Sequence, residues 1–317
     1  MKPLLRPVAW MLSLFLFLTL GCSAIRNCRS TEEPELFSDE KAALWEKLRA
    51  DRPETDAVHD PALKVVVIDV GQGDSILLVS PEGKTMLVDA GPADSFDQIV
   101  GALADNGVSS LDAVVATHPH EDHIGSMAMV LDAYDVGTFY TIASGQPIGS
   151  EAAMLAALER NGCPVLPAEG GAVIPWADSC TVTVLNPIGT YETALPDQND
   201  QSIVLHVRYG NTAVLLTGDA EAAAEKRMLD TFPRSMLKAD VLKLGHHGSS
   251  TSTGYSFFLA VDPDFAVASC GKENAFGHPH LETMSLLYDT RTAFYRTDLD
   301  GTVTFLLDGD HVSVHMP

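Results

Sequence analysis

Four candidate metal ligands, His118, His120, Asp122 and His123, lie within the six-residue run His118-Pro119-His120-Glu121-Asp122-His123. Alternate residues of an extended loop point the same way, so we expect His118 and His120 to share one metal ion. Asp122 and His123, at the start of the next helix, are expected to serve a second ion close by. Imidazole and carboxylate ligands together suit zinc, manganese or iron. The run therefore predicts a centre of two divalent metal ions, with zinc or manganese favoured, and such centres hydrolyse esters at neutral pH.

The elements around this run predict an α/β protein. A buried strand at 113–116 delivers the chain to the histidines, and active sites of α/β proteins lie at the carboxyl ends of strands. Hydrophobic periodicity predicts the remaining elements. The expected strands are 64–70, 75–79, 84–88, 180–185, 202–209, 212–216, 240–244 and 265–269, with a closing hairpin of 301–307 and 311–315, and the expected helices are 94–106, 220–229 and 281–289. Sheets and helices in both halves indicate a four-layer αββα sandwich with the site at the sheet edges.

The N-terminus has the layout of an export signal. Residues 1–21 contain Lys2, Arg6 and then an apolar run, and they end at Gly21-Cys22. The segment Thr19-Leu20-Gly21-Cys22 resembles a bacterial lipobox, although Thr19 replaces the usual leucine, so Cys22 is the expected lipidation site. We therefore expect a lipoprotein on the extracytoplasmic face of the cell membrane, held only by its lipid anchor. A plainly secreted protein and an uncleaved anchor are the alternatives.

Composition separates a polar linker from one folded domain. Residues 22–62 are acidic and proline-punctuated, which indicates a tether with a short helix possible around Glu40 to Arg49, and the domain is expected to span 63–317. The whole chain has 43 acidic and 20 basic residues and a net charge of −23. This charge repels nucleic acid, so a polyanionic substrate must be attracted locally, by metal or by basic side chains. A disulfide between Cys163 and Cys180 suits an exported protein, but spacing alone does not establish it.

The H-x-H-x-D-H run resembles the motif of the metallo-β-lactamase superfamily, and other motifs follow in the family's order. Asp89, in Leu87-Val88-Asp89-Ala90-Gly91, stands where the family keeps an aspartate that orients the metal-binding loop. Asp219, in Leu215-Leu216-Thr217-Gly218-Asp219, stands where the family has the carboxylate that bridges both metals. The alternative for Asp219 is a helix N-cap before Ala220-Glu221. The resemblance implies the metallo-β-lactamase sandwich and favours the bridging role.

The sequence resembles most closely the metallo-β-lactamase domain of the ComEC competence proteins, over roughly residues 64–310. The matching segments are Asp69 to Ser75, Asn199 to Ser202, Thr217 to Glu221, Gly245 to Ser249 and Gly277 to Pro279. ComEC acts in DNA uptake, where this domain is thought to degrade one strand. The transport role is not expected to carry over, because no multi-helix channel segment accompanies the domain here. The resemblance therefore implies a hydrolase.

One ligand position stays open. Many family members place a third histidine before the bridging aspartate, where this chain has Asn199-Asp200-Gln201-Ser202. His206 lies inside the next strand and is expected to be a packed residue. We expect His246 to be the last metal ligand and His278 to contact the substrate, with His247 and His278 as alternative ligands. The residues expected to orient ligands or contact substrate are Asp74, Asp89, Asp200, His247 and Ser249, with Asp122, Asp219 and His278 in catalytic roles.

These observations favour a metal-dependent phosphodiesterase or nuclease, with DNA as a candidate substrate. The first alternative is hydrolysis of another ester or amide on the same centre, such as a phosphocholine ester, a lactone or a lactam, because fold does not choose among these. The second is a lipid-anchored accessory protein without catalysis. The near-complete ligand set argues against the second alternative, and the sequence does not indicate the oligomeric state.

Overall fold

The computed structural model describes residues 39–55, 58–142, 147–189 and 197–317. The expected export signal and Cys22 lie outside the described residues. Within them, none of the helices combines the length and the apolar character needed to cross a bilayer. All elements below belong to the compact unit Leu36–Pro317.

The first sheet has eight strands in the order β15-β14-β1-β2-β3-β4-β5-β6. Strands β15 to β3 pair antiparallel, whereas β3, β4, β5 and β6 are parallel neighbours. This sheet contains β1 (Leu63–Val67), β2 (Ile76–Val79), β3 (Thr85–Val88), β4 (Ser110–Val115), β5 (Asp135–Thr141), β6 (Val165–Pro167), β14 (Val303–Leu307) and β15 (Val312–His315).

The second sheet has seven strands in the order β13-β12-β11-β10-β9-β8-β7. Strands β10, β11, β12 and β13 run parallel, and β7 to β10 pair antiparallel. Its members are β7 (Val173–Ile174), β8 (Cys180–Asn186), β9 (Val204–Tyr209), β10 (Thr212–Leu216), β11 (Val241–Lys243), β12 (Phe265–Ala268) and β13 (Ala293–Arg296).

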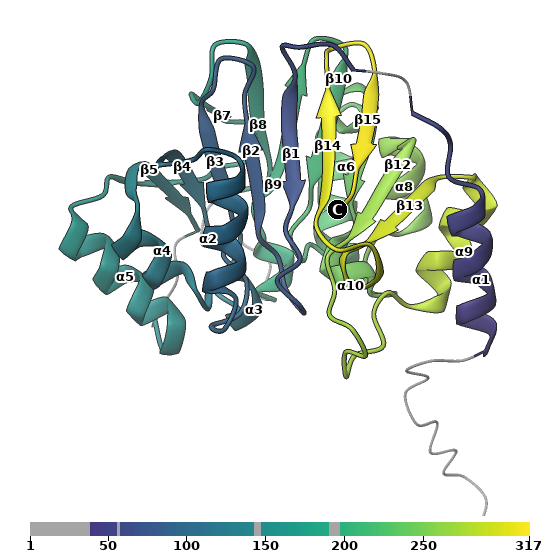
Figure 1. The fold of residues 1–317 in the computed structure, drawn as a ribbon, viewed down its shortest axis with the longest axis horizontal. Helices are drawn as coiled ribbons and strands as arrows, with labels where there is room; N and C mark the ends of the chain where they lie inside the picture. Colours follow the sequence, from purple (N-terminus) through teal and green to yellow (C-terminus); the bar gives the residue numbers. More distant parts are fainter. Residues whose placement is uncertain (1–38, 56–57, 143–146, 190–196) are drawn as a thin grey trace, which may run out of the picture. The chain divides into compact units, whose positions relative to one another are not determined.

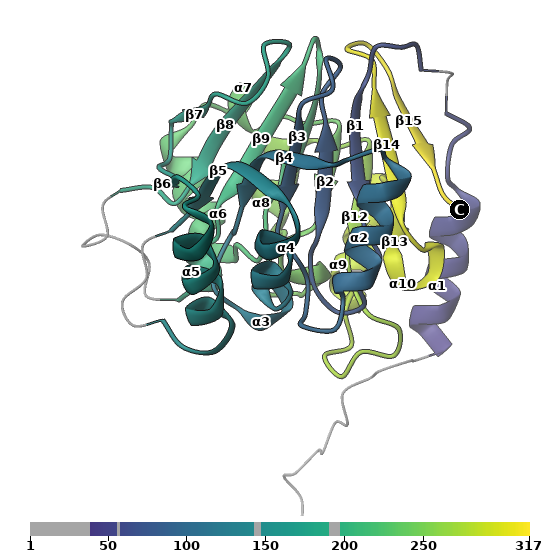
Figure 2. The same cartoon turned by 60° about the vertical axis from the view of Figure 1, so that its left-hand side comes forward.

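The two sheets pack face to face, and helices cover both outer faces (Figures 1 and 2). Three hydrophobic clusters fill the three interfaces of this sandwich. The first sheet is covered by α2 (Phe96–Asp105), α4 (Met127–Ala133) and α5 (Gly149–Asn161), and the second by α1 (Asp39–Ala50), α6 (Ala222–Thr231), α8 (Tyr255–Val261) and α9 (Leu281–Thr290). The predicted four-layer αββα sandwich is confirmed.

Helix α1 extends the folded unit beyond its expected start at Leu63. The buried side chains of Trp45 and Leu48 join the core between the second sheet and its helices. Arg52 pairs with Asp300 just after the helix. The short helix indicated around Glu40 to Arg49 is present as α1, and it packs on the domain where a free tether was expected.

The carboxyl ends of parallel strands create the site. Strands β3 and β4 end beside each other in the first sheet, and β10, β11 and β12 do so in the second. Short helical segments follow several of these ends, namely α3 (Glu121–Ile124) after β4 and the 3₁₀ turn η3 (Gly245–Gly248) after β11. Figure 1 shows α3 at the lower end of both sheets. Loops from two sheets therefore meet at one end of the sandwich.

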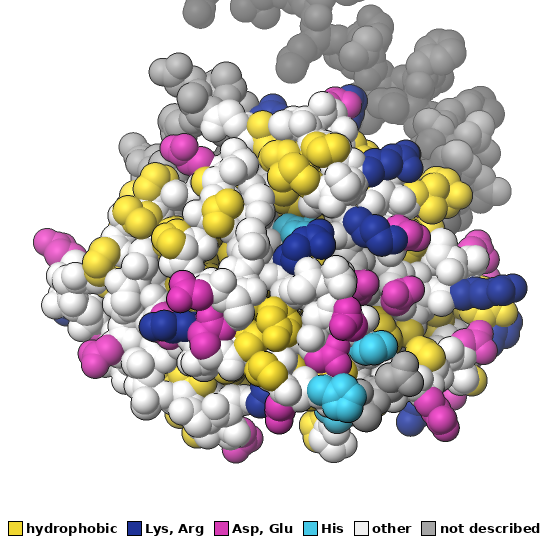
Figure 3. Space-filling model, turned by 90° about the horizontal axis from the view of Figure 1, so that it is seen from above, with side chains coloured by type: hydrophobic (Ala, Val, Ile, Leu, Met, Phe, Trp, Pro, Cys, Tyr) yellow, Lys and Arg dark blue, Asp and Glu magenta, His cyan; other side chains and the backbone are white. Residues whose placement is uncertain are grey.

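Figure 3 shows the opposite end of the molecule. There the lysine and arginine side chains lie interspersed with aspartates and glutamates, and hydrophobic side chains occur in small groups. A surface of mixed charge suits solubility and does not attract one class of charged partner. Among the described residues, the candidate metal-binding side chains lie at the end of the molecule that carries α3.

Candidate metal centre

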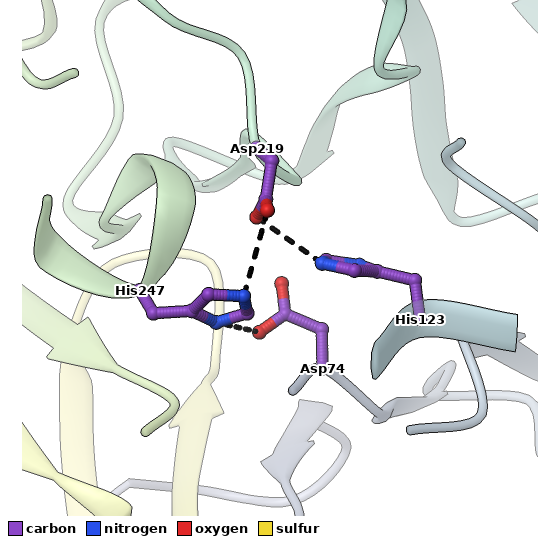
Figure 4. Close-up of side chains that lie close together, drawn as sticks. All are labelled: Asp74, His123, Asp219 and His247. Atoms are coloured by element: carbon purple, nitrogen blue, oxygen red, sulfur yellow. Dashed lines mark ion pairs between the residues drawn. The ribbon is translucent and has the colours of Figure 1, made fainter. Parts of the chain in front are cut away.

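Two groups of potential ligands meet at this end and share one carboxylate. The first consists of His118, His120 and Asp219, and the second of Asp74, His123, Asp219 and His247. Within each group the candidate ligand atoms lie within 4.8 Å of one another. Figure 4 shows the second group, in which side chains from both sheets converge on the Asp219 carboxylate. Asp219 thus lies where a carboxylate can contact two cations, as the family resemblance implies.

In the first group, two imidazoles point toward a common position. His118 Nε2 lies 3.0 Å from His120 Nδ1 and 3.8 Å from Asp219 Oδ2. The other ring nitrogen of His118 is engaged by the hydroxyls of Thr117 at 3.1 Å and Ser202 at 3.3 Å. These contacts fix the ring and leave Nε2 for the centre. The expectation that His118 and His120 can share one ion agrees with this geometry.

In the second group, each imidazole is held by one nitrogen and presents the other. His123 Nδ1 donates to Asp89 Oδ2 at 2.8 Å, and its Nε2 lies 3.2 Å from Asp219 Oδ1. His247 Nδ1 donates to the Ser269 carbonyl at 2.8 Å, and its Nε2 lies 3.2 Å from Asp122 Oδ2. Metal-binding histidines are oriented in this way, by a hydrogen bond from the nitrogen that does not bind metal.

Asp89 has the position expected of an orienting aspartate. Its carboxylate accepts hydrogen bonds from the Thr117 amide at 2.8 Å and the Thr117 hydroxyl at 2.7 Å, in addition to the His123 ring. It is fully buried, and its backbone has a φ of 62°. A left-handed conformation at a buried aspartate costs free energy and indicates a functional constraint. Asp89 therefore links the loop that carries the histidines to the end of β3.

Unsatisfied polar atoms test whether these residues fit divalent cations. Among the described side chains, Asp74 Oδ1, His123 Nε2 and Asp219 Oδ1 are buried and have no hydrogen-bond partner. A buried polar atom without a partner is destabilising, and a bound cation would satisfy all three. The donor set of imidazole nitrogens and carboxylate oxygens suits zinc or manganese. The residues fit a centre of two divalent ions.

The pKa shifts in the centre agree with this fit. Burial, followed by the positive charge on His123, lowers the pKa of His118 well below its usual range, so its ring is neutral, as metal binding requires. Burial opposes the charged forms of His123 and His247, but the surrounding carboxylates, Asp219 foremost, together outweigh it and raise both pKa values. Burial also opposes ionisation of Asp219, yet the two histidines hold its pKa well below the usual range. The imidazoles of His123 and His247 would have to release their protons in order to hold divalent cations.

His247, and not the expected His246, occupies the ligand position in the second group. His246 lies outside both groups, with its Nδ1 donating to Glu221 Oε1 at 2.8 Å and its Nε2 3.7 Å from Asp219 Oδ2. Both histidines have left-handed backbone, with φ values of 46° and 56°. This turn sends the second side chain inward and leaves the first partly exposed. Because the two residues are adjacent and of the same type, the sequence did not indicate which of them points inward.

Asp74 lies deeper in the centre than expected, and it has a partner that the sequence analysis missed. Its Oδ2 forms an ion pair with Lys243 Nζ at 2.8 Å, and both side chains are buried. Lys243 comes from β11 of the second sheet, whereas Asp74 follows β1 of the first. The pair therefore joins the two sheets beside the metal-binding residues. A lysine inside the apolar run Val241-Leu242-Lys243-Leu244 was the available signal.

His278 lies beside the centre without belonging to a ligand group. Its ring is buried and stacks on His247 with the centroids 6.1 Å apart, and its Nδ1 has no hydrogen-bond partner. Burial, followed by the charges of His247 and His246, lowers the pKa of His278 to about 3. A neutral imidazole here can form a hydrogen bond with a substrate, which is compatible with the contact expected from the sequence.

Asp200 and Ser249 do not face the centre. Asp200 Oδ1 accepts the amides of Glu221 at 3.1 Å and Ala224 at 3.0 Å, so it caps the N-terminus of α6. The Ser249 hydroxyl contacts the Thr251 hydroxyl at 2.9 Å within its own loop. Both residues thus lie outside the two ligand groups and make local contacts, and their expected roles in orienting ligands or contacting substrate stay predictions. His206 is packed as expected, with its Nε2 donating to the Lys238 carbonyl.

The three cysteines among the described residues belong to neither ligand group. Cys163, Cys180 and Cys270 are free, so the Cys163–Cys180 bridge is absent from the part of the chain that the structure describes. Burial raises the pKa of the Cys270 thiol to about 12, which keeps it protonated and unreactive. These residues are packing groups.

The chain is similar in sequence to one protein family and to several known proteins. The family described as "Metallo-beta-lactamase superfamily" matches residues 68–272. The chain is 31% identical to "ComE operon protein 3" of Bacillus subtilis over 76% of its own length and 33% of that protein's. It is 34% identical to "Competence protein ComA" of Neisseria gonorrhoeae, over 80% and 33% of the two chains. The chain thus spans about a third of the length of these relatives.

Solved structures share the fold at low sequence identity. Igni18, described as a novel metallo hydrolase from Ignicoccus hospitalis, aligns with a TM-score of 0.52 and 16% identity over 76% of this chain and 98% of that one. CmlA, described as a diiron beta-hydroxylase from Streptomyces venezuelae, also gives 0.52, with 14% identity over 80% and 55% of the two chains. At this identity the likeness establishes the fold alone.

Proposed function

The chain belongs to the metallo-β-lactamase superfamily, and from this premise we propose that it is a metal-dependent phosphodiesterase or nuclease that acts outside the cytoplasm. The observation that carries the proposal is the pair of ligand groups joined through Asp219. The similarity to competence proteins supports a nucleic-acid substrate over other esters. We propose a lipid anchor at Cys22 as the means by which the protein stays at the extracytoplasmic face of the membrane.

Seven side chains would hold two divalent ions. His118, His120 and Asp219 suit one ion, and Asp74, His123, Asp219 and His247 suit the other, with Asp122 Oδ2 beside His247 Nε2 at 3.2 Å. When bound, the ions supply a hydroxide nucleophile at neutral pH and stabilise charge on the oxygens of the ester. Asp89 and the Ser269 carbonyl keep the two buried imidazoles in the orientation that binding requires.

The chain's own residues then position the substrate. His278 remains neutral because of its low pKa, so it can donate a hydrogen bond to an ester oxygen without adding positive charge. His246 lies at the partly exposed side of Asp219, held by Glu221, and is placed to contact an oxygen of the leaving group. Both histidines lie on the second sheet's side of the centre, opposite the loop that carries His118 and His120.

Metal quantification combined with a phosphodiester panel tests the proposal. We expect about two equivalents of zinc or manganese and cleavage of single-stranded DNA, RNA and bis(4-nitrophenyl) phosphate. Asp219→Ala should lose metal and at least a thousandfold in kcat/KM, because it removes a ligand from both groups. Asp132→Ala is the matched control, since that aspartate is exposed and pairs with Arg160 on the surface.

Two outcomes would contradict the proposal. Metal-loaded protein that cleaves none of these phosphodiesters is not a phosphodiesterase, and turnover of nitrocefin or of a phosphocholine ester would then identify a different substrate class. Less than one equivalent of metal, unchanged by His120→Ala, would indicate a protein without a functional centre.

A further inference from the structure

We propose that Phe276 is a stacking platform for a nucleobase of the substrate, close to the scissile phosphodiester. This inference rests on the proposed phosphodiesterase function and specifies its substrate as a nucleic acid with unpaired bases. Phe276 follows β12, in the loop from Gly271 to His280. It is 61% exposed, which is unusual for a phenylalanine beside a buried polar centre.

The exposed ring is connected to the centre by stacked rings. Phe276 stacks on His278 with centroids 5.5 Å apart and an interplanar angle of 21°. His278 stacks in turn on His247, at 6.1 Å and 29°. One face of Phe276 is therefore covered by His278, and the exposed fraction leaves the other face open to solvent. A planar group that adds to this stack lies beside the mouth of the metal centre.

Hydrogen bonds hold the loop in the conformation that presents Phe276. Asn274 Nδ2 donates to the carbonyls of Gly271 at 2.9 Å and His278 at 2.8 Å, and Asn274 Oδ1 accepts the His278 amide. His280 Nε2 donates to the Phe276 carbonyl at 3.0 Å. A fixed aromatic ring loses little conformational entropy when a ligand stacks on it. The exposed side chain is therefore organised for binding before the ligand arrives.

Net charge explains why stacking is needed at this site. A chain with 43 acidic and 20 basic residues repels a polyanion at long range. Stacking on an aromatic face requires no positive charge and accepts any base, since every base has a planar face. Bases within a duplex have both faces covered by their neighbours, so this contact selects single strands. Phe276 is thus a residue that determines substrate specificity.

The test compares an oligodeoxynucleotide with the same oligonucleotide made of abasic nucleotides. Both measurements use metal-loaded protein: binding is measured by fluorescence anisotropy with cleavage-resistant phosphorothioate versions of the two strands, and cleavage is measured with the unmodified strands. We expect Phe276→Ala and Phe276→Leu to weaken binding of the base-containing strand and to raise its KM by about tenfold. Phe276→Tyr should retain wild-type values, and no variant should alter the abasic strand. Tyr288→Ala is the control for loss of an exposed aromatic ring on α9, outside the loop.

The outcomes separate this proposal from the proposed function. Wild type that binds the base-containing strand no better than the abasic strand overturns the stacking role, whether or not phosphodiesters are cleaved. Equal losses for both strands in Phe276→Ala also overturn it, because a structural role for the ring would act on both. The third outcome is that binding depends on the bases and requires Phe276, but no phosphodiester is cleaved. In that case the stacking role of Phe276 stands and the proposed phosphodiesterase function is refuted.

Discussion

At the scale of single residues, three of the four candidate ligand imidazoles are held through one ring nitrogen and present the other to the centre. His118, His123 and His247 are each held by a hydrogen bond to Nδ1, and their Nε2 atoms point toward Asp219. His120 differs, since its Nδ1 faces the centre. Burial of these groups makes every contact between charges stronger than it would be in water.

The geometry predicts different effects for the two adjacent histidines. His247→Ala should remove about one metal equivalent, because it deletes a nitrogen in contact with Asp122 and Asp219. His246→Ala should retain both equivalents and lower kcat by about a hundredfold to ten-thousandfold, the range for a group that assists proton transfer. Metal analysis of the purified variants, with steady-state kinetics, checks this prediction. Loss of metal in the His246 variant alone would reverse the assignment.

At the scale of elements, two carboxylates beside the second sheet accept hydrogen bonds from backbone amides at the N-terminal ends of helices. Asp200 accepts amides at the N-terminus of α6, and Glu225 accepts the amides of Thr253 and Gly254 just before α8. Amide groups at the start of a helix lack partners within it, so a carboxylate there is stabilising. These contacts fix the loop that contains His246 and His247 between two helices.

Asp200→Ala should therefore affect stability and leave the centre intact. We expect the free energy of unfolding to fall by about 1–2 kcal/mol, the effect of losing a helix cap, with metal content unchanged. Urea unfolding monitored by circular dichroism measures the first quantity, and metal analysis the second. Asp197→Ala, in the same loop but exposed, is the matched control. Loss of metal without loss of stability would restore the role expected from the sequence.

Glu225 makes stability depend on pH. Burial raises its pKa to about 7, from 4.5, so the folded state binds a proton more tightly than the unfolded state. The unfolding free energy contributed by Glu225 should then fall as pH rises from about 4.5 toward 7 and stay constant above that. Urea unfolding of wild type and Glu225→Gln at pH 5 and pH 8 checks this. Wild type should lose about 2–3 kcal/mol relative to the variant between these pH values. A difference independent of pH would contradict it.

At the scale of the whole molecule, the negative net charge opposes the proposed function of binding and cleaving a polyanion. The net charge of −23 keeps the protein soluble but opposes the approach of nucleic acid. The end opposite the centre carries interspersed charges of both signs (Figure 3). Attraction of a polyanion therefore depends on the metal centre itself and on uncharged contacts beside it.

Salt should consequently favour cleavage of nucleic acid. Screening shortens the range of the repulsion, so kcat/KM for an oligonucleotide is expected to rise severalfold between 10 and 150 mM salt, where the Debye length falls from about 30 to 8 Å. The value for bis(4-nitrophenyl) phosphate, which carries one charge, should change much less. Parallel kinetics with the two substrates test this, and a steep fall with salt for the oligonucleotide would indicate a basic binding surface instead.

The sequence alone determined the chemistry and the architecture. The spacing of His118, His120, Asp122 and His123 fixed their proximity, because four residues on one short loop cannot lie far apart. Strand and helix periodicity indicated a four-layer sandwich, since burial on one or both faces leaves a direct trace in the pattern of apolar residues. Both features depend on residues that are near one another in the chain.

Tertiary structure decided which distant residues complete the site. His247 points inward and His246 outward because of a left-handed turn that no local pattern encodes. Lys243 meets Asp74 only because two sheets pack face to face, and Asp200 accepts amides at the start of α6, a helix that begins about twenty residues later in the chain. Such contacts join segments far apart in sequence, and their geometry follows from packing of the whole domain. The types of ligand could therefore be predicted from the sequence, whereas the fold decides which residues of those types lie together in the centre.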